Sequence, residues 1–233
     1  MQNDERLSFL HRLLYNVRRS AGKRRRLGDV MMIIETLMTA IFQLFLFTLI
    51  PFIWWLIFWR KKEKFLPWIG LKKPIIENKQ LVILLGCSFL AISLLTNVFF
   101  EVVETSETAV GQFQGMGATA LISGLIFGMI TTGLSEEILF RGFLAKRLIK
   151  QFGFAFGNIF QALLFGIIHV VLFHVFVSID LFQASILFAL PFLTSFFFGY
   201  INEKKSDGSI IPSYLIHGIG NVIASVITMF NLN

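Results

Sequence analysis

Residues 135–143 read Ser-Glu-Glu-Ile-Leu-Phe-Arg-Gly-Phe, and they place two adjacent carboxylates and an arginine in the middle of a strongly apolar chain. An ionised side chain at the centre of a bilayer costs about 2.5–3.5 kcal/mol even on the lenient insertion scales. Three such side chains in one short segment therefore predict a polar site inside a membrane-embedded bundle.

The two glutamates of this stretch differ in their expected partners. Glu137 and Arg141 are four residues apart, so on a helix they share a face and can form a charge-assisted pair. Glu136 lies about 100° around the helix from Glu137 and has no cationic partner at helical spacing. A carboxylate without such a partner is a candidate general base. The stretch alone equally allows a structural ion pair beside a glutamate that reaches water at a helix end.

The composition of the chain is typical of an integral membrane protein. Of the 233 residues, 55% are hydrophobic and 28 are phenylalanine. All 21 Lys and Arg fall in four clusters that alternate with apolar runs, a distribution that marks loops on the cytoplasmic side. These clusters are residues 6–26, 60–79, 141–150 and 204–205. Such a distribution argues against nucleic acid as a partner.

The order of apolar and basic segments predicts an all-α, polytopic transmembrane bundle of about six to seven helices, and hence a multi-pass protein of the cell membrane. Residues 1–29 are expected to form a basic amphipathic segment that contacts anionic lipid headgroups. Residues 30–114 would form two transmembrane helices joined by a basic linker, 60–80, and residues 115–233 a bundle that holds the site. Cys87 is expected to be a packing residue inside an apolar run.

Residues 117–151 are too long for a single straight crossing, because a helix of that length would span roughly 50 Å. We therefore expect a break near Thr132-Gly133, with the glutamates beginning a new helix. Ala120, Gly124 and Gly128 form a series of small residues that would let a neighbouring helix approach closely. The remaining spans are expected at 30–59, 81–103, 154–177, 181–201 and 212–230, with polar loops at 104–116 and 202–209.

The side of the membrane follows from the loops, apart from one conflict. Residues 104–116 contain Glu104 and Glu107 but no basic residue, so this loop is predicted to be non-cytoplasmic. Both ends of the first span are basic, which leaves its orientation open.

Four further polar side chains inside the spans are candidates for the same site: His169, His174, His217 and Asn221. His217 and Asn221 are four residues apart and share a helix face, whereas His169 and His174 diverge by about 140°. Because these two histidines cannot both face one site, we expect His174 to be a packing residue.

Two chemistries fit these residues. In the first, Glu136 and His169 hold and deprotonate a water, while His217 and Asn221 donate hydrogen bonds to an oxyanion, and no cofactor is required. In the second, His169, His217 and Glu136 bind zinc with an open position for water. The sequence contains no H-E-x-x-H signature, so the first is preferred.

Three motifs in this order resemble those of the CPBP family, the CAAX-protease and bacteriocin-processing (Abi) intramembrane endopeptidases. They are Glu136-Glu137-x-x-x-Arg141, Phe165-x-x-x-His169 and His217-x-x-x-Asn221, within residues 115–232. The resemblance implies an all-helical membrane fold, catalysis by Glu136, Glu137, Arg141, His169, His217 and Asn221, and cleavage of a peptide or membrane-anchored protein near the membrane surface. It also implies, for bacterial relatives, a role in bacteriocin processing or self-immunity. It does not decide between zinc and glutamate alone.

Two other classes of function remain open. A non-proteolytic membrane immunity or scaffold protein would keep the fold without the chemistry, and the intact polar set argues against it. A proton or ion transporter would use Glu and His as a relay, but the sequence shows no internal repeat or paired broken helices. If the chain is a peptidase, its cavity is expected to open on the cytoplasmic side, where basic clusters end the glutamate helix and precede the last span.

Overall fold

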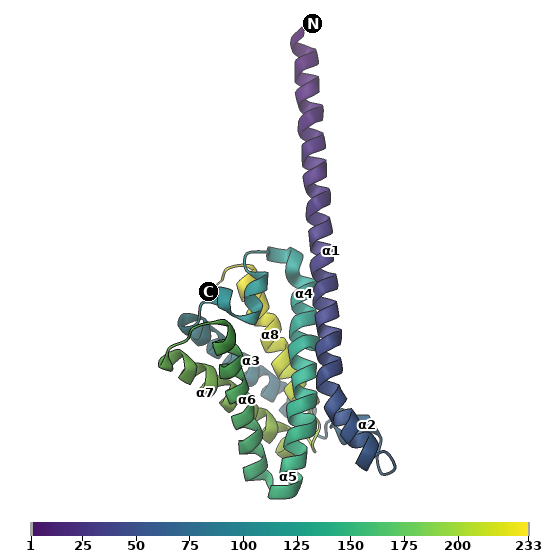
Figure 1. Cartoon of the computed structure of the whole chain (residues 1–233), viewed down its shortest axis with the longest axis vertical. Helices are drawn as coiled ribbons and strands as arrows, with labels where there is room; N and C mark the ends of the chain where they lie inside the picture. Colours follow the sequence, from purple (N-terminus) through teal and green to yellow (C-terminus); the bar gives the residue numbers. More distant parts are fainter. Residues whose placement is uncertain (1, 233) are drawn as a thin grey trace.

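The computed structural model describes the backbone of residues 2–232 and, apart from residues 2–26 and scattered positions within 78–97, their side chains. All regular elements among these residues are helical, which confirms the all-α prediction (Figure 1). The long helices are α1 (Gln2–Phe58), α3 (Asn78–Val102), α6 (Phe154–Phe176), α7 (Leu181–Tyr200) and α8 (Ile211–Met229). The shorter elements are α2 (Phe65–Trp68), η1 (Thr105–Glu107), η2 (Ala109–Phe113), η3 (Gly117–Ala120), α4 (Leu121–Ile126), η4 (Phe127–Leu134), η5 (Glu137–Ala145), α5 (Lys146–Phe152) and η6 (Ile201–Lys205).

Five helical segments among the described residues are long and apolar enough to cross a membrane, so the expected six to seven is an approximate count. They are Leu27–Phe58, Gly117–Phe152, Phe154–Phe176, Leu181–Lys205 and Ile211–Met229. The N-terminal half of α1 extends beyond the rest of the bundle (Figure 1). Most of the predicted basic amphipathic segment, 1–29, has side chains that lie outside the described part of the chain. Its contact with lipid therefore stays a prediction. The domain boundaries also stay predictions.

The helix that carries the glutamates is continuous from Gly117 to Phe152, so the expected break at Thr132-Gly133 is wrong. The chain accommodates this length by widening into the π-helical stretches η4 and η5 on either side of Glu136. The Thr132 hydroxyl lies 3.2 Å from the Phe127 carbonyl oxygen and 3.1 Å from that of Gly128, and Ser135 Oγ donates to Ile130 O at 2.9 Å. These hydroxyls supply donors to carbonyls where the ordinary α-helical pattern is interrupted, so the helix need not end.

Gly124 and Gly128 form a packing face, as predicted, and the neighbouring helix that approaches them is α8. A Cβ on Gly128 would lie 2.7 Å from the Val222 backbone nitrogen, and one on Gly124 would lie 3.2 Å from Ser225 Cβ. The resulting close approach brings the glutamates next to the polar residues of α8.

The linker 60–80, expected only to join two transmembrane helices, packs against the bundle that holds the site. Trp68 and Ile69 are buried with Ile138 and Ile210 in one hydrophobic cluster beneath the glutamate helix. Gly142 permits this contact, because a Cβ there would lie 2.6 Å from the Ile69 carbonyl oxygen. The apolar residues of the linker fold back and cover the basic end of the bundle because burying them stabilises the fold.

Helices α6 and α7 pack through a buried polar network. Gln161 Nε2 donates to the Ser195 carbonyl oxygen at 3.1 Å, and Ser195 Oγ donates to Gln161 Oε1 at 3.0 Å. The helix of α7 continues through η6 to Lys205, so the predicted loop at 202–209 begins later than expected. Asn202 is thereby held on a helix and faces the start of α8.

Candidate active site

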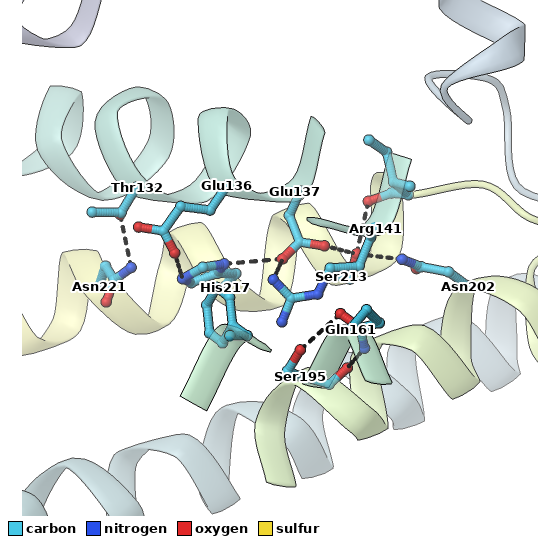
Figure 2. Close-up of polar contacts among 12 residues, drawn as sticks. Thr132, Glu136, Glu137, Arg141, Gln161, Ser195, Asn202, Ser213, His217 and Asn221 are labelled. Atoms are coloured by element: carbon cyan, nitrogen blue, oxygen red, sulfur yellow. Dashed lines mark hydrogen bonds and ion pairs between the residues drawn. The ribbon is translucent and has the colours of Figure 1, made fainter. Parts of the chain in front are cut away.

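The four candidate site residues, which lie on three separate helices, line one cavity of about 410 Å³. Glu136, His169, His217 and Asn221 all contribute to its wall, together with mostly apolar and aromatic side chains. Figure 2 shows Glu136 and Glu137 on one helix facing His217 and Asn221 on α8. The structure therefore brings together the residues that the sequence singled out.

Glu137 and Arg141 form the ion pair that their spacing predicted. Arg141 Nη1 lies 3.0 Å from Glu137 Oε1, and both side chains are buried, with 1% and 0% of their surface exposed. The guanidinium lies over the Phe165 ring at 4.3 Å and over Phe198 at 5.2 Å. The two aromatic faces add cation–π attraction and hold the arginine under the site.

Glu137 also accepts hydrogen bonds from α8, which the sequence did not suggest. Ser213 Oγ donates to Glu137 Oε2 at 2.5 Å, and His217 Nδ1 lies 3.0 Å from Glu137 Oε1. A carboxylate can only accept, so the proton of neutral His217 lies on Nδ1. The second nitrogen, Nε2, is then the one available to the cavity.

Glu136 differs from its neighbour in having an unpaired carboxylate oxygen. Its Oε2 is buried and has no hydrogen-bond partner, and the nearest cationic candidate is His217 Nε2 at 3.7 Å. This distance exceeds a direct hydrogen bond, so the two side chains lie beside each other without forming one. Glu136 is therefore the carboxylate with a free acceptor at the cavity wall.

The other two histidines in the spans have different surroundings. His169 Nδ1 lies 2.7 Å from the carbonyl oxygen of Phe165 on the same helix. The other ring nitrogen, Nε2, does not take part in this contact. His169 lines the cavity, whereas His174 is exposed on the helix surface and is not among the lining residues. His174 therefore faces away from the site, as expected, but it is exposed, so the expectation that it is a packing residue is wrong.

Asn221 is oriented by the glutamate helix. Its Nδ2 donates to Thr132 Oγ1 at 2.7 Å, and both residues line the cavity (Figure 2). Fixing the amide in this way holds it in one orientation at the same wall as Glu136.

Sequence reasoning missed three polar residues that support the site: Thr132, Ser213 and Asn202. Thr132 precedes Glu136 by four residues, and Ser213 precedes His217 by four, so each shares a helix face with a predicted site residue. This spacing was a usable signal. Asn202 had none, because its contact depends on how the turn between α7 and α8 folds.

The cavity lies next to the segment 104–116, which carries Glu104 and Glu107. Its lining includes Thr108, Ala109 and Val110 from the acidic loop, and no described residue of 60–79, 141–150 or 202–209. The buried linker residues Trp68 and Ile69 pack at the basic end instead. The opening of the cavity toward the cytoplasm stays a prediction.

The zinc alternative requires Glu136, His169 and His217 to act as ligands of one metal ion. Among the described residues, no three His, Cys, Asp or Glu side chains form a group suited to a metal ion. His217 already contacts Glu137 through Nδ1, so only its Nε2 could serve. The side chains in this arrangement therefore do not form the three-ligand site.

Residues 118–223 match the family model described as type II CAAX prenyl endopeptidase Rce1-like. This segment contains all three motifs and confirms the resemblance to the CPBP family. No curated protein and no solved structure matches the chain. The family match and the five apolar helices identify an integral membrane protein and support intramembrane endopeptidase activity in general.

Proposed function

Taking the Rce1-like segment at 118–223 as the premise, we propose that this protein is an intramembrane endopeptidase in which Glu136 activates the hydrolytic water. The observation that carries the proposal is that Glu136 lines the cavity with 16% of its side chain exposed and lies beside His217, with 3.7 Å between Oε2 and Nε2. A general base needs a carboxylate that water can approach, and the Glu136 side chain is partly exposed at the cavity whereas that of Glu137 is fully buried and paired.

In the proposed reaction, Glu136 takes a proton from water as the oxygen attacks the peptide carbonyl. His169 holds that water through Nε2, and Asn221 together with protonated His217 donates hydrogen bonds to the oxyanion. The proton on Glu136 then passes to the departing amine, so the carboxylate is regenerated. Glu137 and Arg141 keep His217 in place, because Glu137 accepts from its Nδ1.

The substrate class follows from the cavity and the family. A largely apolar cavity lined by side chains such as Phe99, Phe127 and Leu172 suits a hydrophobic group next to the scissile bond. We propose a membrane-anchored peptide or protein, with a prenylated C-terminal peptide as the first probe because of the family description. Bacteriocin processing or self-immunity is the physiological role to examine if the source is bacterial.

Hydrolysis can be tested with purified protein in nanodiscs and a fluorescent, C-terminally prenylated peptide, in water enriched in ¹⁸O. The expected result is a single internal cut, with the label in the new C-terminal carboxylate. An absence of products would contradict the proposal and favour a non-proteolytic scaffold. Proton or ion flux in proteoliposomes without cleavage would favour a transporter.

The role of metal can be tested separately by elemental analysis of the purified protein. If glutamate and histidine activate the water alone, the protein should contain no stoichiometric zinc and should keep its activity in a chelator. About one zinc per chain, lost in His169→Ala, would replace the proposed mechanism with a metallopeptidase.

A further inference from the structure

A chain of hydrogen bonds leads from the end of α7 to the candidate active site. Asn202 Nδ2 donates to Ser213 Oγ at 2.7 Å, and Ser213 Oγ donates to Glu137 Oε2 at 2.5 Å (Figure 2). The other oxygen of Glu137 contacts His217 Nδ1 at 3.0 Å. Asn202, Ser213 and Glu137 are all buried, so water does not compete for these bonds.

The direction of these bonds follows from what each group can donate. The Ser213 hydroxyl has one proton and two neighbouring acceptors, Glu137 Oε2 at 2.5 Å and the Ile210 carbonyl oxygen at 3.1 Å. The shorter contact is in the range of a hydroxyl donating to an ionised carboxylate. The Asn202 amide occupies one lone pair of Ser213 Oγ, which turns the hydroxyl proton away from Asn202.

The backbone between these two residues is built to hold them together. Asn202 lies in η6, and its carbonyl oxygen accepts from Gly208 N at 2.7 Å. Gly208 has a φ of 71°, which closes the turn, and its carbonyl oxygen accepts from Lys146 Nζ at 2.6 Å. Lys146 also pairs with Glu203 at 2.7 Å. The turn before α8 is thus tied to both α5 and η6.

We propose that Ser213, oriented by Asn202, is a positioning residue that fixes the Glu137 carboxylate and so presents His217 Nε2 to the cavity. The catalytic consequence rests on the proposed function. Without the Ser213 donor, Glu137 keeps Arg141 and His217 on Oε1 only, and its carboxylate is free to rotate. His217 then loses its single orientation and its preference for a proton on Nδ1.

A purely structural role would give a different pattern, and the chain offers a matched control. Ser195 is equally buried, and its Oγ donates to the Gln161 side chain of another helix at 3.0 Å, but neither residue bonds to Glu137 or His217 in the structure. Ser195→Ala therefore measures the cost of losing a buried interhelical serine bond away from the site.

The kinetic test compares Ser213→Ala, Asn202→Leu and Ser195→Ala in the peptide-cleavage assay, each at matched thermal stability. Ser213→Ala should lower kcat by about 10- to 100-fold with KM nearly unchanged, the range seen for outer partners of functional histidines. Asn202→Leu should also lower kcat, but by a smaller factor than Ser213→Ala does. Ser195→Ala should leave kcat near the wild-type value. Equal kcat in Ser213→Ala and Ser195→Ala would overturn the proposal.

A second readout does not depend on turnover. Protein labelled with ¹⁵N-histidine, at a pH where His217 is neutral, should show the His217 proton on Nδ1, with the resonance assigned from a His217→Gln sample. Ser213→Ala should give a mixture of both tautomers, and Ser195→Ala should not. If the wild type cleaves nothing but the tautomer still shifts, the proposed function fails and the positioning role stands. An unchanged tautomer in Ser213→Ala overturns the positioning role itself.

Discussion

Glu136 and Glu137 are neighbours in the sequence, yet the helix turns their carboxylates toward different surroundings. Glu137 is fully buried and contacts Arg141, His217 and Ser213, whereas Glu136 has a carboxylate oxygen without a hydrogen-bond partner at the cavity wall. The pair with Arg141 was predictable, because the two residues are four apart on one helix. The contacts from α8 were not, because they join residues about eighty positions apart.

Glu137→Gln should destabilise the protein, because it leaves Arg141 buried without a counter-charge. Removing one partner of a buried ion pair typically costs about 3–5 kcal/mol. A lower midpoint of thermal unfolding in detergent is the expected observation, with Glu136→Gln as the matched control near the wild-type value. Equal midpoints for the two variants would contradict this division of roles.

At the scale of single elements, the glutamate helix shows how a long apolar segment can cross without breaking. Its length suggested a break, but hydroxyls of Thr132 and Ser135 bond to carbonyls of the preceding turn and the helix widens instead. Sequence periodicity does not reveal this, because α- and π-helical turns use the same residue types. The small-residue series was informative because it identifies a packing face whatever the exact winding.

Gly128→Ala should separate the glutamate helix from α8, because the new Cβ would lie 2.7 Å from the Val222 backbone nitrogen. Overpacking of this kind typically costs about 1–3 kcal/mol. We expect a lower unfolding midpoint and, since His217 and Asn221 lie on α8, reduced peptide cleavage. Gly86→Ala is the control, because no atom lies within 4 Å of its added Cβ. Equal unfolding midpoints for the two variants would contradict the packing account.

At the scale of the whole molecule, the two ends of the bundle differ in charge and in access. The basic end is covered by the linker through Trp68 and Ile69, and the cavity extends toward residues 108–110 in the acidic loop. The positive-inside rule then places the cavity on the non-cytoplasmic side. The basic N-terminal segment argues for the reverse, so the orientation needs a direct measurement.

Thiol labelling in intact cells can decide the orientation. In a Cys87→Ser background, Ala109→Cys should react with a membrane-impermeant maleimide added outside, since Ala109 is exposed and lines the cavity. Lys204→Cys, at an exposed position on the basic end, should react only after the cells are permeabilised. The opposite pattern would place the cavity on the cytoplasmic side.

The sequence predicted the helical class, the approximate spans and the convergence of Glu136, His169, His217 and Asn221. Convergence was predictable because polar side chains in apolar membrane helices face the interior of the bundle or a cavity. It failed where the outcome depended on tertiary contacts. The linker was expected to be only a basic connection between two spans, whereas its Trp68 and Ile69 are buried. The role of Ser213 was hidden because a serine at the start of a helix is ordinarily a local feature.

The central claim is that Glu136 is the base of a peptidase, and the most direct measurement pairs activity with stability for Glu136→Gln. This substitution keeps the size of the side chain and breaks no hydrogen bond of Glu136 Oε2, since that atom has none. The account predicts that Glu136→Gln unfolds at the wild-type temperature and cleaves no prenylated peptide under conditions in which the wild type does. Cleavage by Glu136→Gln at the wild-type rate would contradict it.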